Sequence, residues 1–462
     1  MQKIPVIAIF DIGKTNKKIL LFDDQYNLVF EETKQLEEIK DEDQFPCEDL
    51  NALAGFIKNT FSRLLKDDRY EIKAVNVSAY GASFVYLDES LNVIPPLYNY
   101  LKPYSPALKE KFYSSYGGES YFARTTASPV LGNLNSGMQI YRLKYEKPES
   151  FAKIKHVLHL PQYISFILTN KIYSDITSIG CHTNLWDFEN NKYHSWVTAE
   201  GIAEKLSPII DSDKIATHIN ETILAGIGLH DSSAALIPYL ISFNEPFVLL
   251  STGTWCITLN PFNNTPLTDD ELQQDCLCYL SYQGKRVKAS RLFAGYEHEQ
   301  ETKKLSEHFN KPFDYYKTLS YDLKRFKALR SLKKAPVNNG DHAMIHQSDF
   351  ASRDLNGFAD YEEAYHQLIE DIVAQQFYSS SLVFEGTGIK RIFVDGGFSN
   401  NQIYMNTLAR AFPGIEVYAT SVPQASALGA ALVIHKHWNS KTVPPGIIEL
   451  QRYPPNHEKA NQ

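Results

Sequence analysis

Two short apolar runs near the start of the chain flank a polar turn. Residues 6–10 and 19–22 have the length and the β-branched content of strands, and the segment between them carries one glycine and three lysines. This pattern predicts a β-hairpin. Further elements are predicted after it, namely strands at 28–30, 73–78 and 84–87 and an amphipathic helix at 51–65. Strands followed by a helix and another strand are typical of a mixed α/β domain.

The same pattern of two apolar runs around a polar turn returns about 240 residues later. Residues 247–251 and 256–259 read as strands, and Thr252-Gly253-Thr254-Trp255 lies between them. The elements predicted beyond it are helices at 361–384, 401–412 and 424–435 and strands at 391–395 and 415–418. We interpret the chain as two copies of one architecture, with domains at 1–244 and 245–462 and a cleft between them. Ligand sites prefer such clefts.

The region between the two hairpins is less regular. Residues 98–155 are rich in Tyr, Gly, Ser and Asn, which indicates loops and short helices that line a pocket. Residues 159–169 read as a buried helix with a proline start at Pro161. A glycine-rich turn at 225–228 then delivers His230 and Asp231 to a short helix that is expected to end at Pro238.

Composition and charge narrow the functional classes. A chain of 462 residues is long for one core, and its net charge of −8 argues against non-specific nucleic-acid binding. Five cysteines, an odd number, suggest free thiols in a reducing compartment. The first apolar run is short and ends at Asp11, so we expect no signal peptide, and no run has transmembrane length. We therefore expect a cytoplasmic protein without a membrane partner.

The first turn has the chemistry of a phosphate site. Its N–H groups, the Thr15 hydroxyl and the charge of Lys14, Lys17 or Lys18 could face one anion. Asp11, at the end of the first strand, could hold a divalent cation beside that anion. The turn is not a Walker loop, because Ala8 stands in place of the first glycine and no helix pattern follows. A surface hairpin whose lysines serve solubility stays open.

Two later turns could also carry chemistry. Gly396 and Gly397 separate a strand from a helix, so the backbone can approach a ligand closely at a helix N-terminus, which favours negative charge. The alternative is a tight connection that merely needs glycine. Asp231 could take a proton from an alcohol that attacks phosphorus, or it could simply cap its helix. Spacing alone does not decide between these two readings.

Five segments, taken in order, resemble the FGGY family of carbohydrate kinases. They are Asp11-Ile12-Gly13-Lys14-Thr15-Asn16, Gly228-Leu229-His230-Asp231-Ser232, Ser251-Thr252-Gly253-Thr254-Trp255, Asp395-Gly396-Gly397-Phe398-Ser399-Asn400 and Gln424-Ala425-Ser426-Ala427-Leu428-Gly429-Ala430-Ala431. The resemblance covers nearly the whole chain and implies an α/β fold of two ribonuclease-H-like (actin/hexokinase-type) domains. The Gly-Thr-Trp turn, the His-Asp pair and residues 80–85 are most similar to the L-rhamnulose and L-fuculose kinase branch.

The resemblance also implies roles for individual residues. Asp11 would hold Mg²⁺ through water, and Asp231 would be the catalytic base that deprotonates the primary hydroxyl of a ketose. The other implied contacts are Gly81, Ala82 and His230 with the sugar, and Gly13, Lys14, Thr15, Asn16, Thr254, Gly396 and Gly397 with ATP.

The chain departs from the family in several places. Lys14 stands where threonine is usual, Ser83 replaces a common acidic residue, and residues 131–140 lack the usual lysine and tryptophan. The predicted function is an ATP-dependent kinase for L-rhamnulose, which would give L-rhamnulose 1-phosphate, with L-fuculose or a pentulose such as xylulose as alternatives. A non-enzymatic actin- or Hsp70-like ATP-binding assembly protein and a sugar sensor without catalysis are the other hypotheses. The sequence is compatible with a homodimer.

Overall fold

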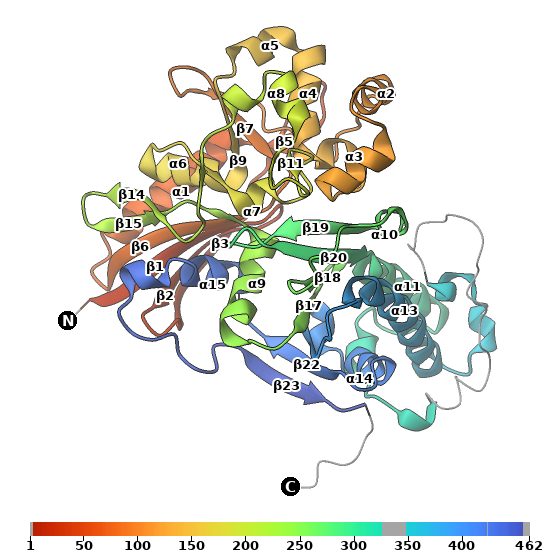
Figure 1. The fold of residues 1–462 in the computed structure, drawn as a ribbon. Helices are drawn as coiled ribbons and strands as arrows, with labels where there is room; N and C mark the ends of the chain where they lie inside the picture. Colours follow the sequence, from red (N-terminus) through yellow and green to blue (C-terminus); the bar gives the residue numbers. More distant parts are fainter. Residues whose placement is uncertain (1–2, 326–347, 423, 456–462) are drawn as a thin grey trace. The chain divides into compact units, whose positions relative to one another are not determined.

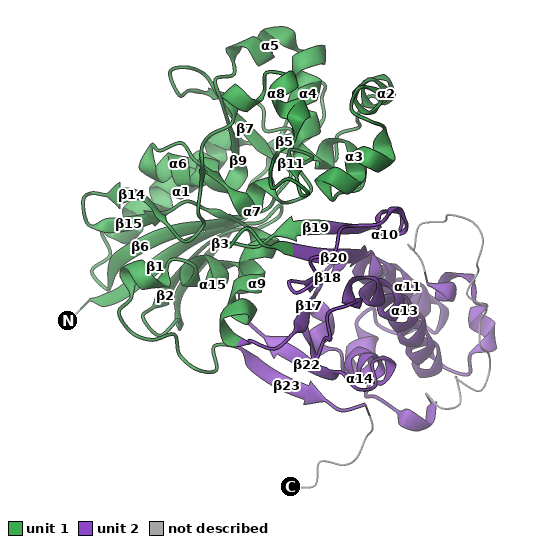
Figure 2. Cartoon of the chain, viewed as in Figure 1, with its two compact units in different colours: residues 1–242, 278–286, 423–447 green, residues 243–277, 287–422, 448–462 purple. Residues whose placement is uncertain are grey.

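The computed structural model describes residues 3–325, 348–422 and 424–455. The chain divides into two compact units (Figure 2), of which unit 1 comprises residues 1–242, 278–286 and 423–447 and unit 2 comprises residues 243–277, 287–422 and 448–462. The first stretch of unit 1 ends close to the predicted boundary at residue 244. Two later segments that the prediction assigned to the second domain belong to unit 1, so the units are not consecutive in sequence.

A seven-stranded mixed sheet lies at the centre of unit 1 (Figure 1). Its strands, in spatial order, are β14 (Ile215–Ile219), β15 (Ile223–Gly226), β6 (Tyr70–Ala79), β1 (Ile4–Ile12), β2 (Lys17–Asp23) and β3 (Leu28–Lys34), with β16 (Leu229–His230) paired to β6. Strand β1 is antiparallel to β2 and parallel to β6. The predicted hairpin and third strand are therefore confirmed.

Helices cover both faces of this sheet. α1 (Leu50–Leu65) and α6 (Leu160–Thr169) lie on one face, and α9 (Asp231–Ser242) and α15 (Ala425–Leu432) lie on the other (Figure 1). A strand with both faces covered reads as a continuous apolar run. This is why residues 6–10 of β1 are all fully buried, and each large apolar side chain among them contributes about 1.5–3 kcal/mol.

The remaining strands of unit 1 form small sheets, so the predicted strand 84–87 is not part of the central sheet. These strands are β4 (Glu38–Lys40) with β5 (Pro46–Glu48), β7 (Phe84–Leu87) between β8 (Val93–Ile94) and β9 (His156–His159), β10 (Ser174–Asp175) with β13 (Ile209–Ile210), and β11 (Trp186–Asp187) with β12 (Lys192–Tyr193). The other α-helices are α2 (Pro106–Ser115), α3 (Glu119–Thr126), α4 (Ser136–Glu146), α5 (Pro148–Lys153), α7 (Ile176–Ile179), α8 (Ser195–Ala199) and α16 (His435–Trp438).

The tyrosine-rich region 98–155 contains the predicted short helices, but many of its aromatic side chains do not line a pocket. Tyr98, Tyr113 and Tyr141 are buried in a second core of unit 1 around Phe112 and Trp196. The ring of Phe112 meets that of Trp196 edge-on at 5.1 Å. An aromatic ring buries a large area, so these residues serve packing.

Unit 2 repeats the strand order of unit 1. The order β3-β2-β1-β6-β15 corresponds to β20-β18-β17-β21-β22, in which a hairpin strand is again parallel to the next long strand. The complete second sheet consists of β19 (Cys276–Leu280), β20 (Arg286–Leu292), β18 (Cys256–Asn260), β17 (Phe247–Thr252), β21 (Arg391–Gly396), β22 (Glu416–Ser421) and β23 (Glu449–Tyr453). The chain passes from one unit to the other within β19 and β20. The predicted duplication is confirmed.

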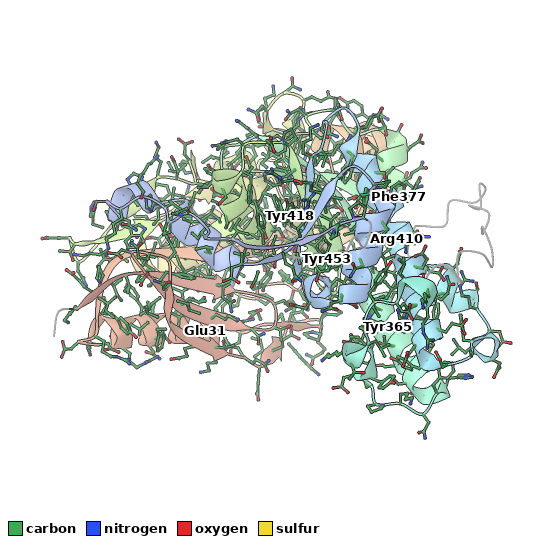
Figure 3. The ribbon with its side chains drawn as sticks, turned by 90° about the horizontal axis from the view of Figure 1, so that it is seen from below. Glu31, Tyr365, Phe377, Arg410, Tyr418 and Tyr453 are labelled. Atoms are coloured by element: carbon green, nitrogen blue, oxygen red, sulfur yellow. The ribbon has the colours of Figure 1, made fainter. Side chains whose placement is uncertain are left out.

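Helices pack on the second sheet around one apolar core. They are α11 (Ala294–His308), α13 (Tyr361–Phe384) and α14 (Gln402–Ala411). The short helix α10 (Asp269–Gln273) contributes no residue to this core. Tyr365 of α13 and Tyr453 of β23, both buried in this core, are labelled in Figure 3. The predicted helix at 361–384 is confirmed to the residue.

Helix α9 corrects one prediction. Pro238 does not end it, and the helix continues to Ser242. A proline inside a helix has no N–H for the carbonyl four residues earlier, which here is that of Ala234. Gly429 of α15 approaches this same carbonyl so closely that a Cβ on Gly429 would lie 1.8 Å from the oxygen. The two helices are therefore in close backbone contact at the carbonyl to which Pro238 cannot donate.

Candidate active site

The first predicted turn connects β1 to β2. The N–H of Gly13 donates to the carbonyl of Asn16 at 2.9 Å and closes the turn. Thr15 and Asn16 are exposed. Across the part of the chain that the structure describes, the N–H groups of Lys14, Thr15 and Asn16 have no backbone acceptor. They are available to an anion, as the sequence predicts.

The three lysines of the turn have different surroundings. Lys14 Nζ lies 2.6 Å from Glu38, and Lys18 Nζ lies 3.0 Å from Glu31. Lys17 is buried, so the expectation that its charge could face an anion is wrong. Its side chain passes under the turn, where the ammonium finds a buried carboxylate in place of water.

Asp11 is the last residue but one of β1 and is partly buried. Burial raises the pKa of its carboxyl to about 6, and the negative charge of Asp231 adds to this increase. The Ser426 hydroxyl donates to Asp11 Oδ2 at 3.0 Å and opposes the shift. Lys18, the cross-strand neighbour of Asp11, is a nearby positive charge. Asp11 and Asp231 are thus brought together in unit 1.

Asp231 is the first residue of α9. Burial raises its pKa to about 6 although Ser232 donates to it, with the N–H of Ser232 at 2.6 Å from Oδ1. A capping side chain accepts from N–H groups two or three residues further on. Among the described residues, the Asp231 carboxylate accepts from Ser232 but from neither of the next two N–H groups, so it does not act as a cap of α9. At a pKa near 6 it is mostly ionised at neutral pH, as a base must be.

The ring of His230 lies beside this carboxylate. Nε2 lies 3.2 Å from Asp231 Oδ1 and 3.1 Å from Cys181 Sγ. Burial lowers the pKa of His230 to about 3, so the imidazole is neutral. The ring stacks on Tyr279 at 5.8 Å, and its main-chain N–H donates to Thr177 Oγ1 at 3.0 Å.

The segment predicted to face the sugar packs on the same histidine. A Cβ on Gly81 would lie 2.9 Å from His230 Cδ2, so only glycine allows this approach. Ala82 has a φ of +58°, in the left-handed region that costs a residue with a Cβ free energy. Its carbonyl accepts a hydrogen bond of 2.7 Å from Gln139 Nε2, which holds the strained residue in place.

The nucleotide residues predicted in the second half of the chain lie in unit 2. A Cβ on Gly396, whose φ is +89°, would lie 2.0 Å from the carbonyl oxygen of Thr252. The Thr252 hydroxyl donates to the carbonyl of Asp395 and accepts from the N–H of Phe398. Gly397 begins a 3₁₀ turn at Gly397–Asn400. The carbonyl of Thr254 accepts the N–H of Tyr296 at 3.1 Å.

Several residues around the site were not singled out from the sequence. Ser426 belongs to the closing motif, which suggested its importance but not its contact with Asp11. Thr177, Cys181 and Tyr279 approach His230 from sequence positions about 50 residues away. Only Thr177 carried a usable signal, because it follows Asp175 in a helix-capping pattern.

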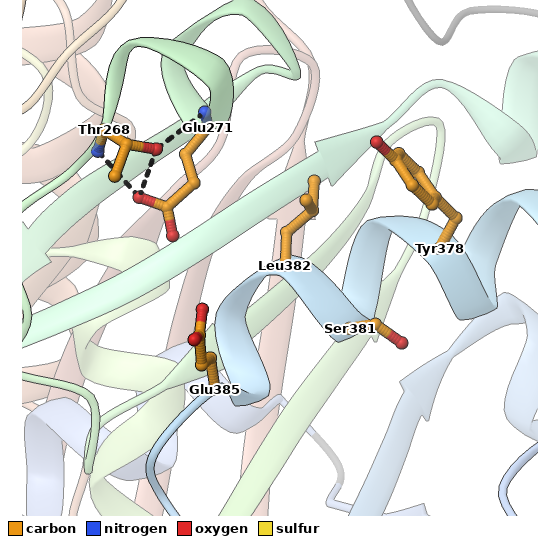
Figure 4. A pocket seen from close by; sticks show the side chains of 6 residues that line it. All are labelled: Thr268, Glu271, Tyr378, Ser381, Leu382 and Glu385. Atoms are coloured by element: carbon orange, nitrogen blue, oxygen red, sulfur yellow. Dashed lines mark hydrogen bonds between the residues drawn. The ribbon is translucent and has the colours of Figure 1, made fainter. Parts of the chain in front are cut away.

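A separate cavity of about 270 Å³ lies in unit 2 between α10 and α13 (Figure 4). It is lined by Thr268, Glu271, Tyr378, Ser381, Leu382 and Glu385. None of the predicted site residues lines it.

The described residues contain no group of three or more His, Cys, Asp or Glu side chains arranged to hold a metal. Mg²⁺ does not need such a group, because it is usually held by one or two carboxylates together with water and substrate phosphates. Asp11 fits this requirement. Among the helices that the structure describes, none has the length and apolar character to span a bilayer.

Solved structures define the class of fold. A carbohydrate kinase from Novosphingobium aromaticivorans matches 97% of this chain and 96% of its own with a TM-score of 0.76 and 22% identity. Ligand-bound xylulose kinase from Lactobacillus acidophilus matches 98% of this chain and 94% of its own with a TM-score of 0.78 and 18% identity. The fold is that of the two-domain sugar kinases, and the predicted fold class is confirmed.

The family follows from the sequence of unit 1. Residues 6–235 match the N-terminal domain of the FGGY family of carbohydrate kinases. The chain thus contains an N-terminal domain of the FGGY carbohydrate kinases, and the predicted resemblance is confirmed. A curated relative, the rhamnulokinase of Mannheimia succiniciproducens, is 21% identical over 274 residues, which are 57% of this chain. The match spans 55% of the relative, so the chain aligns with about half of its length.

Proposed function

We propose that the protein is an ATP-dependent kinase that transfers the γ-phosphoryl group to the primary hydroxyl of a ketose. The observation that carries the proposal is the placement of two carboxylates, Asp11 and Asp231, at adjacent strand ends of one sheet. Asp11 of β1 is opposite Ser78 of β6, and His230, the residue before Asp231, is opposite Ala79 of the same strand. Partial burial raises the pKa of both carboxyl groups to about 6. One of these carboxylates suits a base, and the other suits a cation site beside the exposed N–H groups of the 13–16 turn.

The proposed step is a single displacement at phosphorus. The ketose oxygen forms a bond to the γ-phosphorus, the bond from that phosphorus to the β-bridging oxygen breaks, and ADP leaves. The hydroxyl proton passes to an oxygen of Asp231. Mg²⁺, held by Asp11 through water, would neutralise phosphate charge. The turn residues Gly13, Lys14, Thr15 and Asn16 would bind phosphate, as would Thr254, while Gly396 and Gly397 would lie against the nucleotide.

L-Rhamnulose is the first proposed substrate, with L-fuculose or a pentulose such as xylulose as alternatives. The similarity of residues 80–85 and of the Gly-Thr-Trp turn to the L-rhamnulose and L-fuculose kinase branch supports this order, as does the curated relative named rhamnulokinase. Gly81, Ala82 and His230 would form the sugar side of the site. We propose that the two domains predicted at 1–244 and 245–462 carry the sugar and phosphate contacts and the nucleotide contacts, respectively, and that the protein acts in the cytoplasm.

The test is ADP release on a panel of L-rhamnulose, L-fuculose, D-xylulose, D-ribulose and glycerol, with Asp231→Asn as the variant. Loss of a general base lowers kcat by about 10²–10⁴-fold. We expect that loss with ADP affinity within about twofold of wild type. Asp68→Asn is the control, because the side chain of Asp68 is 97% exposed. Near wild-type turnover by Asp231→Asn would show that the base is misassigned.

A further inference from the structure

Glu48 is a buried carboxylate to which the proposed mechanism gives no role. It ends β5 and is 4% exposed. Each of its two oxygens has a partner from a different part of unit 1. Lys17 Nζ lies 2.5 Å from Oε1, and the Tyr80 hydroxyl donates to Oε2 at 2.9 Å. One partner supports the 13–16 turn, and the other precedes the segment that packs on His230.

Lys17, the first partner of Glu48, fixes the shape of the phosphate turn at residues 13–16. Lys17 Nζ also donates to the carbonyls of Gly13 at 3.1 Å and Lys14 at 2.9 Å. Both carbonyls therefore point inward, toward the ammonium group. When consecutive carbonyls are held on one side, the N–H groups between them face the other side, where an anion can bind. The ion pair with Glu48 keeps the Lys17 side chain in this position.

Tyr80, the second partner of Glu48, fixes the sugar-side turn at residues 80–83, which packs on His230. The Tyr80 ring is 7% exposed and meets the Tyr100 ring edge-on at 6.2 Å. Gly81 follows directly, and its backbone runs so near the imidazole that an added Cβ would lie 2.9 Å from His230 Cδ2. A rotation of Tyr80 would therefore move the backbone that supports His230, which neighbours Asp231.

We propose that Glu48 is a positioning residue that ties the phosphate turn to the sugar-side turn, so that nucleotide binding and sugar binding depend on each other. The proposal rests on the proposed function, because it assigns these turns to ATP and to a ketose. Fold stability alone does not explain the arrangement, since a buried ion pair can often be replaced by apolar residues without loss of stability. A common anchor for two turns explains why the charges are retained.

The test uses one variant for each partner of Glu48 and one for Glu48 itself. Lys17→Met should weaken ADP binding about tenfold and change the KM of the ketose by less than twofold. Tyr80→Phe should raise the KM of the ketose about tenfold and change ADP affinity by less than twofold. Glu48→Gln should weaken ADP binding and raise the KM of the ketose. It should also remove the dependence of ADP affinity on the presence of sugar, and titration calorimetry with ADP, with and without the ketose, measures this dependence. The matched control is Lys102→Met, because Lys102 forms another buried ion pair of unit 1, with Asp41.

Glu48→Gln leaves the ammonium of Lys17 buried without a full counter-charge, and this single variant could fail to fold. The double variant Lys17→Met/Glu48→Gln removes both charges. We expect it to melt closer to wild type than Glu48→Gln does, and to bind ADP as weakly as Lys17→Met. Recovery of wild-type ADP affinity in the double variant would overturn the proposal.

Amide hydrogen exchange separates this proposal from the proposed function. In Glu48→Gln, the amides of Gly13 and Tyr80, which donate to the carbonyls of Asn16 and Ile12, should both lose protection, whether or not the wild type phosphorylates a sugar of the panel. Faster exchange in one segment only, or lowered thermal stability with unchanged ligand binding as in Lys102→Met, would show that Glu48 is merely structural. If the wild type does not turn over, the kinase assignment is refuted. The exchange result then still decides whether Glu48 positions the two turns.

Discussion

Gly429 of α15 offers the sharpest test of how unit 1 is built. An added Cβ would lie 1.8 Å from the carbonyl oxygen of Ala234 and 2.6 Å from its carbonyl carbon, whereas ordinary contacts begin near 3.4 Å. The obstacle is backbone and cannot rotate away. In Gly429→Ala, α15 must therefore move from α9 by about 1.6 Å, the difference between the required and the available distance.

The free-energy change follows from two opposed effects. Overpacking a tight contact costs about 1–3 kcal/mol, and alanine in place of glycine gains about 1 kcal/mol of helix propensity. The contact with backbone places the cost at the upper end, so we expect a net loss of about 2 kcal/mol. Gly55 of α1 is the matched control, because a Cβ there meets nothing within 4 Å. Gly55→Ala should gain up to about 1 kcal/mol.

Calorimetry and kinetics together measure this prediction. A difference of about 3 kcal/mol between the two variants corresponds to a Tm difference of roughly 6–12 °C for a domain of 150–250 residues. Ser426 lies one turn before Gly429 and donates to Asp11 at 3.0 Å, so a shift of the helix also breaks this bond. We expect kcat/KM to fall at least tenfold in Gly429→Ala alone. Equal Tm values for the two variants would refute the close helix contact.

Two further predictions concern the same site. Activity should fall as pH decreases through about 6, because Asp231 must be ionised to accept a proton and burial raises its pKa to about 6. The stability of the fold should change in the opposite direction. The pKa values of Asp11 and Asp231 in the folded protein, about 6, lie above the value of 3.8 for an exposed Asp. These groups therefore stabilise the fold fully below about pH 4 and lose that contribution as pH rises through 6. In Asp11→Asn, this pH dependence of Tm should be smaller, and an unchanged Tm–pH profile would contradict the desolvation of Asp11. Thr177→Val should lower stability by about 1–3 kcal/mol and reduce kcat, because the buried N–H of His230 loses its acceptor and the Asp175 carboxylate loses the Thr177 hydroxyl as a donor. A lowered Tm with unchanged kcat would show that Thr177 does not position His230.

Apolar periodicity along the chain was sufficient for most of the fold. Strands buried on both faces have continuous apolar runs, and long amphipathic helices repeat every 3.6 residues, so both hairpins and the helix at 361–384 could be read directly. The duplication was visible for the same reason. The continuation of α9 beyond Pro238 could not be read, because a proline removes a helical hydrogen bond and the local pattern therefore indicates an end there.

The site was predictable only in its parts. Turns rich in glycine and carboxylates mark Asp11, Asp231 and Gly396 locally, because close backbone approach and desolvated charge need those residue types. Which lysine faces an anion was not predictable, since Lys14, Lys17 and Lys18 are chemically alike and only their tertiary partners distinguish them.

The sequence by itself thus determined the architecture, the family and the residue types of the site, because these depend on local pattern and composition. Only the tertiary structure decided that Lys17 is buried against Glu48, that Ser426 contacts Asp11, and that Cys181 and Tyr279 enclose His230. These contacts join residues far apart along the chain, and no local pattern records them. Burial, which sets the pKa values of Asp11 and Asp231, is likewise a property of the folded unit.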